Sequence, residues 1–167
     1  MNEAEFLAPV PIDSRIRERL RGGAYRLTGD RTLAEDIAQE AVLRVLSEGE
    51  PRDLPYLFQV VLNLVRNEAR RIARRRTGLS SALDRVADPA DPGPLQNVLA
   101  DERDRRLWSA LGTIPDRERS VLLLRFAEGM TCSEIARVTG ASPNAVSCLI
   151  HRGKERMREL LAPRSMA

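Results

Sequence analysis

Six arginines within eleven residues form the densest group of charged side chains in the sequence, and Glu68 is the only acidic residue among them. Such a density suits a polyanion, because each guanidinium placed against a phosphate releases condensed counterions. Cations also favour the C-terminal end of a helix, so a solvated helix end explains the same run equally well. The six are Arg66, Arg70, Arg71, Arg74, Arg75 and Arg76.

A second candidate binding segment is TCSEIARVTGASPNAVSCLIHRGKERMREL, which begins at Thr131. Thr131 and Glu134 have the spacing of a capping box, which predicts a helix start. Gly140 ends that helix after barely two turns. Ser142 is a typical N-cap for the next helix, and Pro143 fits its first position, where a missing N–H costs nothing. A short helix, a tight turn and a second helix indicate a helix-turn-helix motif.

In this motif the second helix lies in the major groove and presents one face to base edges. With Val146, Ile150 and Met157 turned inward, the outward face carries amide, hydroxyl, imidazole and guanidinium groups that can bond to bases or phosphates. Short helical pairs also use a glycine turn merely for packing, but the caps, turn and basic helix together favour DNA contact. The expected contacts are Ser142, Asn144, Ser147, Cys148, His151, Arg152 and Lys154.

Catalytic and metal-binding patterns are not recognisable elsewhere in the sequence. Two cysteines and one histidine are too few soft ligands for an ordinary zinc site. No Ser/His/Asp pattern or glycine-rich phosphate loop occurs, so we expect no enzyme activity, no metal and no cofactor. No apolar run reaches the ~18 residues of a membrane span, and the N-terminus lacks the features of a secretory signal. Membrane insertion is therefore not expected, and the expected location is the cytoplasm.

The elements that position these side chains are expected to be helices throughout. Apolar periodicity predicts one helix over 12–27 and another over 54–76. Between them it predicts a helix that begins with a capping box at Thr32 and Glu35 and ends at Gly49. Acidic residues and prolines then accumulate without a helical or strand pattern. Helices are predicted again over 107–114 and 116–127, followed by the helix-turn-helix. The predicted fold class is all-α, with two small helical domains, residues 1–76 and 100–167, joined by a flexible acidic linker, residues 77–99.

Three stretches resemble extracytoplasmic-function sigma factors, which are promoter-specificity subunits of bacterial RNA polymerase. They are AYRLTGDRTLAEDIAQEAVLRVL, LPYLFQVVLNLVRNEARRIARRR and the region from LWSALGTIPDRERSVLLLRF through the helix-turn-helix. The resemblance covers about residues 12–76 and 107–161. It implies a region 2-like domain, a region 4-like helix-turn-helix domain, and a protein that binds core polymerase and directs promoter recognition and transcription initiation.

The resemblance also implies where the partners bind. The family signature for docking on the β′ clamp helices falls on Asp36, Gln39 and Glu40. The helix-turn-helix domain would contact the −35 element and sit on the β flap, and an anti-sigma factor often keeps such proteins silent.

In a melted DNA strand, unpaired bases can stack on an aromatic ring, while amides bind the base edges and arginines bind the phosphate backbone. The residues implied for the −10 promoter DNA are Tyr56, where the family usually has Trp, and Asn63, Arg66, Asn67, Arg70, Arg71 and Arg74.

Ser147 and Leu149 depart from the family pattern, which usually has a basic residue and an arginine at these positions. Two fewer phosphate contacts should weaken −35 binding and flatten its salt dependence. A free-standing helix-turn-helix regulator is one alternative, although it should dimerise and the first domain offers no heptad seam. A sigma-mimicking adaptor that binds a regulator instead of DNA is the other alternative. Ser147 and Leu149 keep it open, although the arginines of both domains argue against it.

Overall fold

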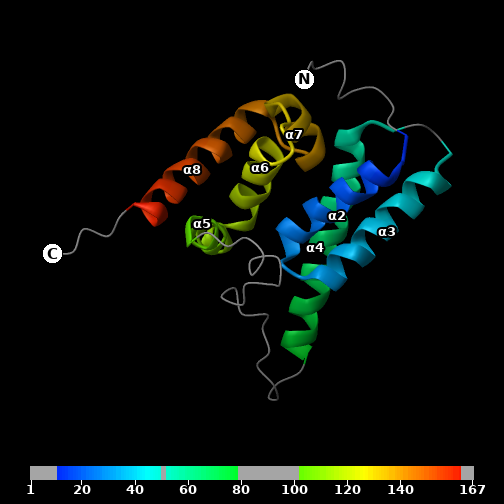
Figure 1. Cartoon of the computed structure of the whole chain (residues 1–167), viewed down its shortest axis with the longest axis horizontal. Coiled ribbons are helices and arrows are strands. Elements are labelled where there is room, and N and C mark those ends of the chain that lie inside the picture. Colours follow the sequence, from blue (N-terminus) through cyan, green and yellow to red (C-terminus); the bar gives the residue numbers. More distant parts are fainter. Residues whose placement is uncertain (1–10, 50–51, 79–101, 163–167) are drawn as a thin grey trace.

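Seven α-helices account for all regular secondary structure in the residues that the computed structural model describes, which are 11–49, 52–78 and 102–162 (Figure 1). The all-α prediction is confirmed. The predicted linker lies outside the described residues, except that Thr77 and Gly78 extend the third helix. The helices are α2 (Ser14–Thr28), α3 (Arg31–Ser47), α4 (Leu54–Gly78), α5 (Glu102–Thr113), α6 (Asp116–Phe126), α7 (Cys132–Thr139) and α8 (Pro143–Leu161).

Helices α2, α3 and α4 form the first helical group, in which each helix contacts the other two. Leu20 and Ala24 of α2, Ala41 of α3 and Leu57 of α4 are fully buried between them. Phe58 is 1% exposed and lies against the glycine at position 23 of α2, where a side chain would not fit. The apolar stripe of each helix therefore faces one shared core, which leaves the opposite face of α3 exposed.

The start of α3 differs from the prediction. The Asp30 carboxylate accepts a hydrogen bond from the N–H of Leu33 at 3.0 Å, and the helix begins at Arg31. Thr32 and Glu35 thus lie inside the helix and do not form a capping box. Asp is at least as good an N-cap as Thr, and Asp30 has the extended backbone that the capping position requires.

Helices α5 to α8 form the second group, in which α6 and α8 cross closely. Gly153 of α8 is buried, and a Cβ built there would lie 2.8 Å from Leu122 of α6. Leu111, Ile114 and Leu123 complete a small core between α5 and α6. This crossing turns the other side of α8 towards solvent along much of its length.

The two helical groups also pack against each other, which the sequence did not predict. Helix α7 lies beside α4, and α6 contacts α2 (Figure 1). One continuous buried cluster includes Leu20 and Val61 from the first group with Met130 and Ile135 from the second. The described parts of the two domains thus form a single packed body.

Ion pairs cross this contact. Glu128, in the turn between α6 and α7, accepts hydrogen bonds from Nε of Arg19 at 2.8 Å and from Nη1 of Arg26 at 2.9 Å. Its main-chain oxygen accepts a third, from Nη2 of Arg19, at 2.7 Å. Farther along the contact, Arg137 of α7 donates to Asp53 at 2.7 Å. We refer to Glu128, Arg19 and Arg26 as the Glu128 cluster.

Candidate nucleic-acid and protein interfaces

The helix-turn-helix forms as its local sequence predicts. The Thr131 hydroxyl accepts from the N–H of Glu134 at 3.2 Å, and the Glu134 carboxylate accepts from the N–H of Thr131 at 2.7 Å. Gly140 ends α7 with φ of 71°, in the left-handed region that favours glycine. The Ser142 hydroxyl accepts from the N–H of Ala145 at the start of α8. These caps fix the angle at which α8 leaves the turn.

The outer face of α8 is solvent-exposed. Val146 is fully buried, and Ile150 and Met157 are half-buried, so the inward side is the predicted one. Arg152, Lys154 and Arg156 are all exposed, and Arg156 pairs with Glu118 of α6 at 2.9 Å. Lys154 lies to one side of α8, where it lines an apolar groove described below. The exposed residues include all of the predicted DNA contacts: Ser142, Asn144, Ser147, Cys148, His151, Arg152 and Lys154. Each of these side chains is therefore accessible to a nucleic acid.

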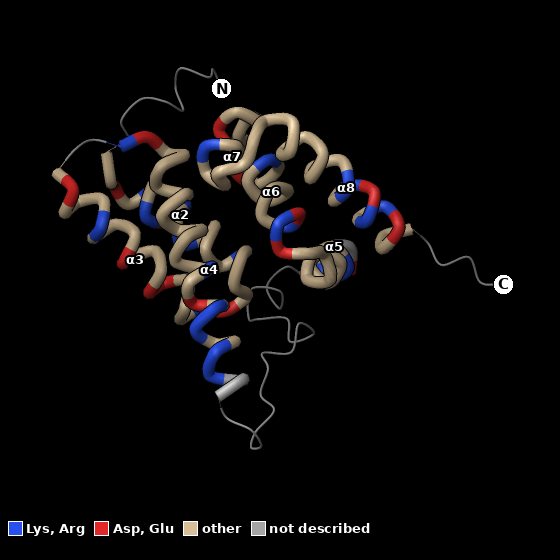
Figure 2. The backbone as a smooth tube through the Cα atoms, turned by 180° about the vertical axis from the view of Figure 1, so that it is seen from behind, with Lys and Arg blue, Asp and Glu red and all other residues tan. Residues whose placement is uncertain are grey.

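Cationic residues gather along the C-terminal half of α4 (Figure 2). Asn63 and Asn67 are exposed one helical turn apart. A hollow of about 480 Å³ lies beside them and is lined by Asn67, Arg70, Arg71, Arg74 and Arg75. Arg71 forms an ion pair with Glu68 at 2.7 Å, and the side chains of Arg70 and Arg75 are exposed. This surface can follow the phosphates of one nucleic-acid strand.

Arg66 lies apart from that row, on the side of α4 that faces the second helical group. Its side chain is half-buried, and burial lowers the pKa of its guanidinium, as do the charges of Arg117 and Arg70. Arg117 belongs to α6, so cations of both domains converge here. An anion placed at this point would relieve their repulsion.

Tyr56 also lies apart from the arginine row, eleven residues or about 16 Å of helix before Asn67. Its hydroxyl donates to the Glu48 carboxylate at 2.8 Å, and the Arg52 guanidinium lies 4.7 Å from its ring centroid. The hydrogen bond to Glu48, together with partial burial and the Glu48 charge, raises the pKa of Tyr56. One ring face is therefore covered by Arg52, and a base could stack only on the other face or after Arg52 moves.

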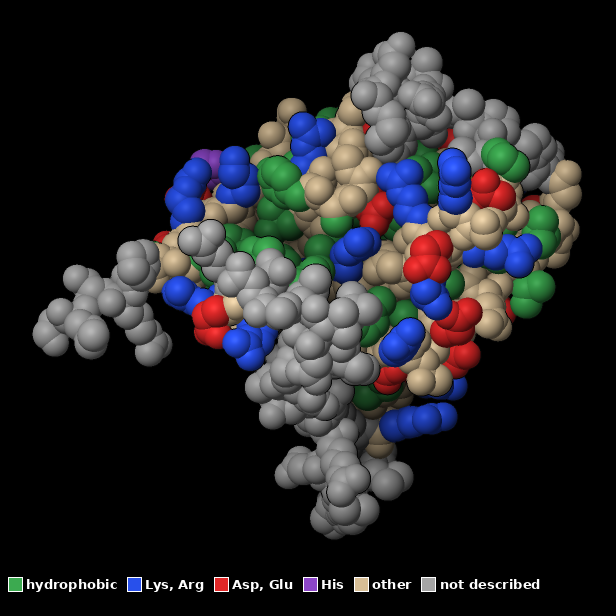
Figure 3. All heavy atoms as spheres, in the orientation of Figure 1, with side chains coloured by type: hydrophobic (Ala, Val, Ile, Leu, Met, Phe, Trp, Pro, Cys, Tyr) green, Lys and Arg blue, Asp and Glu red, His purple; other side chains and the backbone are tan. Residues whose placement is uncertain are grey.

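The exposed face of α3 carries the three residues predicted to dock on polymerase. Asp36, Gln39 and Glu40 are all exposed. Glu40 forms an ion pair with Arg44, with 2.7 Å between Oε1 of Glu40 and Nε of Arg44. Leu43 and Leu46 follow, at 63% and 57% exposure, and sequence reasoning missed them. Figure 3 shows hydrophobic side chains on the surface near this end of α3. The sequence could have indicated them, because both leucines lie outside the apolar stripe of the helix.

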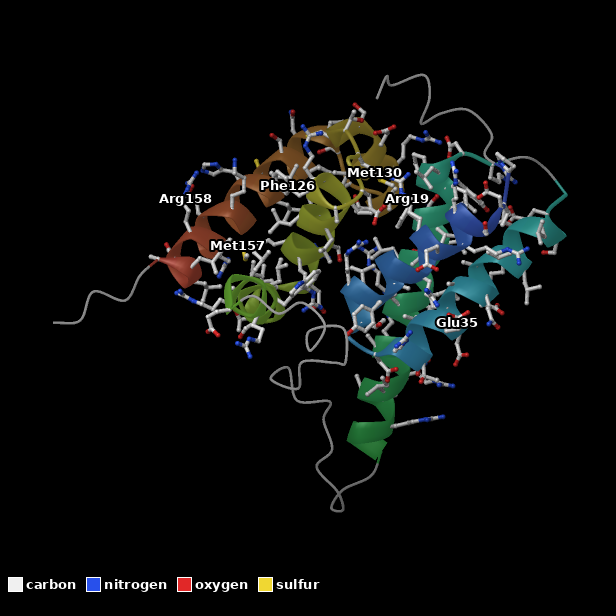
Figure 4. All side chains as sticks on the ribbon, in the orientation of Figure 1. Arg19, Glu35, Phe126, Met130, Met157 and Arg158 are labelled. Carbon is white, nitrogen blue, oxygen red and sulfur yellow. The ribbon has the colours of Figure 1, made fainter. Side chains whose placement is uncertain are left out.

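An apolar groove of about 520 Å³ in the second helical group was also missed. Trp108 and Leu111 of α5, Leu122 and Phe126 of α6, and Met157 of α8 line it. Phe126 is 64% exposed, and Arg26 of α2, Lys154 and Arg158 add cationic side chains to the lining. Figure 4 shows the placement of Phe126, Met157 and Arg158. A groove of this composition suits an apolar segment with acidic flanks.

Metal-binding geometry is not found in the described ranges. No three His, Cys, Asp or Glu side chains there come together in a way that could hold an ion. Cys132 is half-buried and Cys148 is exposed, both as free thiols. None of the helices in the same ranges is both long enough and apolar enough to cross a membrane.

Comparison with known proteins identifies both halves of the chain. Residues 14–77 match sigma-70 region 2, and residues 104–157 match sigma-70 region 4. The RNA polymerase sigma factor CarQ of Myxococcus xanthus is 32% identical over 157 residues, which cover 89% of this chain and 86% of CarQ. The ECF RNA polymerase sigma factor SigE of Mycolicibacterium smegmatis is 34% identical over 148 residues, or 85% of this chain. The chain spans only 57% of the length of SigE.

Solved structures give the same fold. CnrH, in its complex with the cytosolic domain of CnrY, superposes with a TM-score of 0.62 at 25% identity, over 89% of this chain and 83% of CnrH. The sigma factor RpoE of Bartonella quintana, in complex with the anti-sigma factor NepR, gives a TM-score of 0.68 at 20% identity, over 88% and 92% of the two chains. Helices α2–α4 and α5–α8 thus correspond to arrangements already known in sigma factors.

Proposed function

Because the chain belongs to the extracytoplasmic-function sigma factors of bacterial RNA polymerase, we propose that it binds core polymerase in the cytoplasm and directs transcription initiation from a set of promoters. This family consists of transcription regulators rather than enzymes. The observation that carries the proposal is the presence, in one chain, of both sigma regions with a cationic α4 and an exposed helix-turn-helix face. One surface suits a melted strand and the other suits a duplex groove.

Core polymerase docks first, on the exposed face of α3. Asp36, Gln39 and Glu40 supply carboxylates and an amide, and Leu43 and Leu46 supply apolar contact beside them. A basic coiled coil, such as the β′ clamp helices, offers the complementary charge and an apolar ridge. The two leucines strengthen this interpretation, because an ordinary solvated face would not carry them side by side.

The melted −10 strand is then held along α4. Asn63 and Asn67 present amides to base edges, and the arginines at 70, 71 and 74 hold the backbone. Arg66 contacts the same DNA from the side of the helix that faces Arg117. Tyr56 stacks a base at the far end of the row, on the ring face that Arg52 leaves open.

The −35 duplex is bound by the outer face of α8. Asn144 and Arg152 have the side chains that pair with adenine and guanine edges in a major groove. Ser142, Ser147, Cys148, His151 and Lys154 surround them and contact bases or phosphates. Because these residues are exposed, the face can enter the groove without rearrangement of the motif.

The apolar groove of α5, α6 and α8 receives the β flap. Its leucines and Trp108 supply the apolar contact, and Phe126 is an exposed anchor at its edge. An anti-sigma factor is a further proposed partner, which would compete for the same surfaces. The structurally similar RpoE was crystallised with the anti-sigma factor NepR, which supports this partner class.

Gel filtration of the purified chain with bacterial core polymerase tests the proposal, with and without a pool of genomic promoter fragments. Co-elution and retention of a distinct set of fragments are expected. Asp36→Arg should abolish co-elution while the fold persists, whereas Glu159→Arg, the same charge change at the exposed end of α8, should not. If the folded chain fails to co-elute, the sigma factor function is refuted. DNA binding alone would then indicate the free-standing regulator, and no DNA binding would indicate the adaptor.

A further inference from the structure

A hollow of about 550 Å³ lies beside α2, between the start of α3 and the turn that joins α6 to α7. Small-molecule sites commonly have volumes of about 300–1,000 Å³. None of the residues proposed above to bind the clamp helices or promoter DNA lines this hollow, although Arg26 and Ala127 line both it and the apolar groove. Basic and acidic side chains are interspersed over α2 and α3 on the face that Figure 3 shows.

Arginines outnumber acidic side chains in this hollow. Glu128 and Glu18 are the two glutamates of its lining, and Glu18 has a side chain that is 69% exposed and pairs with Arg21 at 2.6 Å. Arg15 and Arg31 form no ion pair within the described part of the chain. The hollow therefore carries excess positive charge and suits a ligand with several negative charges. The lining arginines are Arg15, Arg19, Arg21, Arg26 and Arg31.

The Glu128 cluster holds two of these guanidiniums in fixed positions. Each carboxylate oxygen of Glu128 accepts from a different arginine, and the Glu128 side chain is itself only 4% exposed. The side chains of Arg19 and Arg26 remain 31% and 35% exposed, so a ligand in the hollow can reach them. Groups that are already ordered lose less conformational entropy when they bind a ligand. The cluster is thus a preorganised anion-binding element.

An aromatic ring and an open position complete the hollow. Tyr25 is half-buried and lines it, and the face of its ring can stack on a base or another flat ring. Gly22 also lines it, and a Cβ built there would meet only the flexible guanidinium of Arg26. A flat group can therefore lie close to the backbone of α2 beside the ring.

This combination points to one class of ligand. The planar guanidinium matches two phosphate oxygens at once, which makes arginine well suited to phosphate groups. Tyr25 adds a surface for a base, which inorganic phosphates would not use. Residues of α2, α3 and the turn between α6 and α7 surround the hollow, so it accommodates a small ligand better than a continuous nucleic-acid backbone.

We propose that this hollow binds a nucleoside polyphosphate. The phosphates bind Arg15, Arg31 and the arginines of the Glu128 cluster, and the base stacks on Tyr25. This site goes beyond the proposed function, because it belongs to the free chain and requires neither polymerase nor promoter DNA. Its occupant would lie against α3, since Arg21 of the lining pairs with Glu35 at 3.5 Å (Figure 4 labels Glu35).

Isothermal titration calorimetry of the full chain with ATP, GTP and inorganic triphosphate tests the site. Both nucleotides should bind more tightly than triphosphate, because only they have a base. Arg31→Gln should weaken the binding of all three roughly tenfold, as expected for loss of a charged hydrogen bond. Arg17→Gln makes the same charge change at an exposed position of α2 outside the hollow, and should leave binding unchanged.

Substitution of Tyr25 separates the base from the phosphates. Tyr25→Leu should weaken ATP and GTP binding roughly tenfold, through loss of stacking, and leave triphosphate binding unchanged. Tyr25→Phe keeps the ring and should bind like the parent. If Tyr25→Leu weakens nucleotide binding no more than triphosphate binding, the contact with the base is refuted.

Substitution of Gly22 tests the hollow without a change of charge. Gly22→Leu places a side chain in the hollow, and should abolish nucleotide binding while circular dichroism shows an intact fold. If folded Gly22→Leu binds nucleotides like the parent, the hollow is not the site. Arg70→Gln on α4 tests the other cationic surface, and should leave nucleotide binding unchanged. Loss of binding in Arg70→Gln equal to that in Arg31→Gln, or no binding by the parent, would also refute the proposal.

Discussion

Two adjacent glycines of α2 provide a test of the helix contact that positions the cationic face of α4. A Cβ built on Gly23 would lie 2.6 Å from Cε1 of Phe58, whereas one built on Gly22 meets only the flexible guanidinium of Arg26, whose nearest atom, Nη1, is 3.6 Å away. Gly→Ala gains about 1 kcal/mol of helix propensity at either position. At Gly23 the alanine also crowds a ring that is 1% exposed, and such overpacking costs about 1–3 kcal/mol.

The two variants should therefore change stability in opposite directions. Gly22→Ala should stabilise the protein by up to about 1 kcal/mol, and Gly23→Ala should destabilise it by up to about 2 kcal/mol. Urea unfolding followed by circular dichroism measures both, and the sole tryptophan, Trp108, reports separately on the second domain. Phe58→Leu should reduce the cost of Gly23→Ala in a double-mutant cycle. Equal stability of the two alanine variants would refute the close approach of α2 to Phe58.

Three further perturbations test other local interactions. Arg152→Ala should cost roughly 1–3 kcal/mol of promoter affinity in an equilibrium binding assay and leave co-elution with polymerase intact, whereas Arg105→Ala on α5 should change neither. Thr131→Ala should lower the free energy of unfolding by about 0.5–2 kcal/mol through loss of the α7 capping box, with the exposed Ser133→Ala as control. Glu48→Gln should lower the pKa of Tyr56 in an absorbance titration. Because that pKa is raised on folding, the stability from this contact should be complete at neutral pH and lost as pH rises above about 10.

The helix-turn-helix could be predicted in detail because its determinants are local. Thr131 with Glu134, and Ser142 with Ala145, are each three residues apart, and Gly140 can adopt the positive φ that ends α7 without steric cost. The start of α3 was predicted wrongly for an equally local reason, since two capping candidates compete within three residues there. Periodicity locates a helix but does not choose between adjacent caps.

The contact between the domains could not be predicted in the same way. Arg19 and Glu128 are 109 residues apart, and neither stands out in the sequence from the other arginines and glutamates around it. Their pairing depends on how two separately formed helical groups meet, which a single sequence does not specify. The apolar groove depends on the same kind of long-range assembly. Leu43 and Leu46 differ, because their position off the buried stripe of α3 was visible in the sequence.

Ser147 and Leu149, the two positions of α8 that depart from the family pattern, have different surroundings in the structure. Ser147 is exposed on the outer face, so a cation is truly missing there, whereas Leu149 is half-buried and packs against the core. We therefore expect the −35 face to lack one phosphate contact instead of two. Ser147→Arg should steepen the dependence of log affinity on log salt by about 0.9, the value for one phosphate. Leu149→Arg should instead lower the free energy of unfolding, because it removes apolar packing. If Leu149→Arg steepens the salt dependence as much as Ser147→Arg and leaves stability unchanged, position 149 faces DNA and the orientation deduced for α8 is wrong.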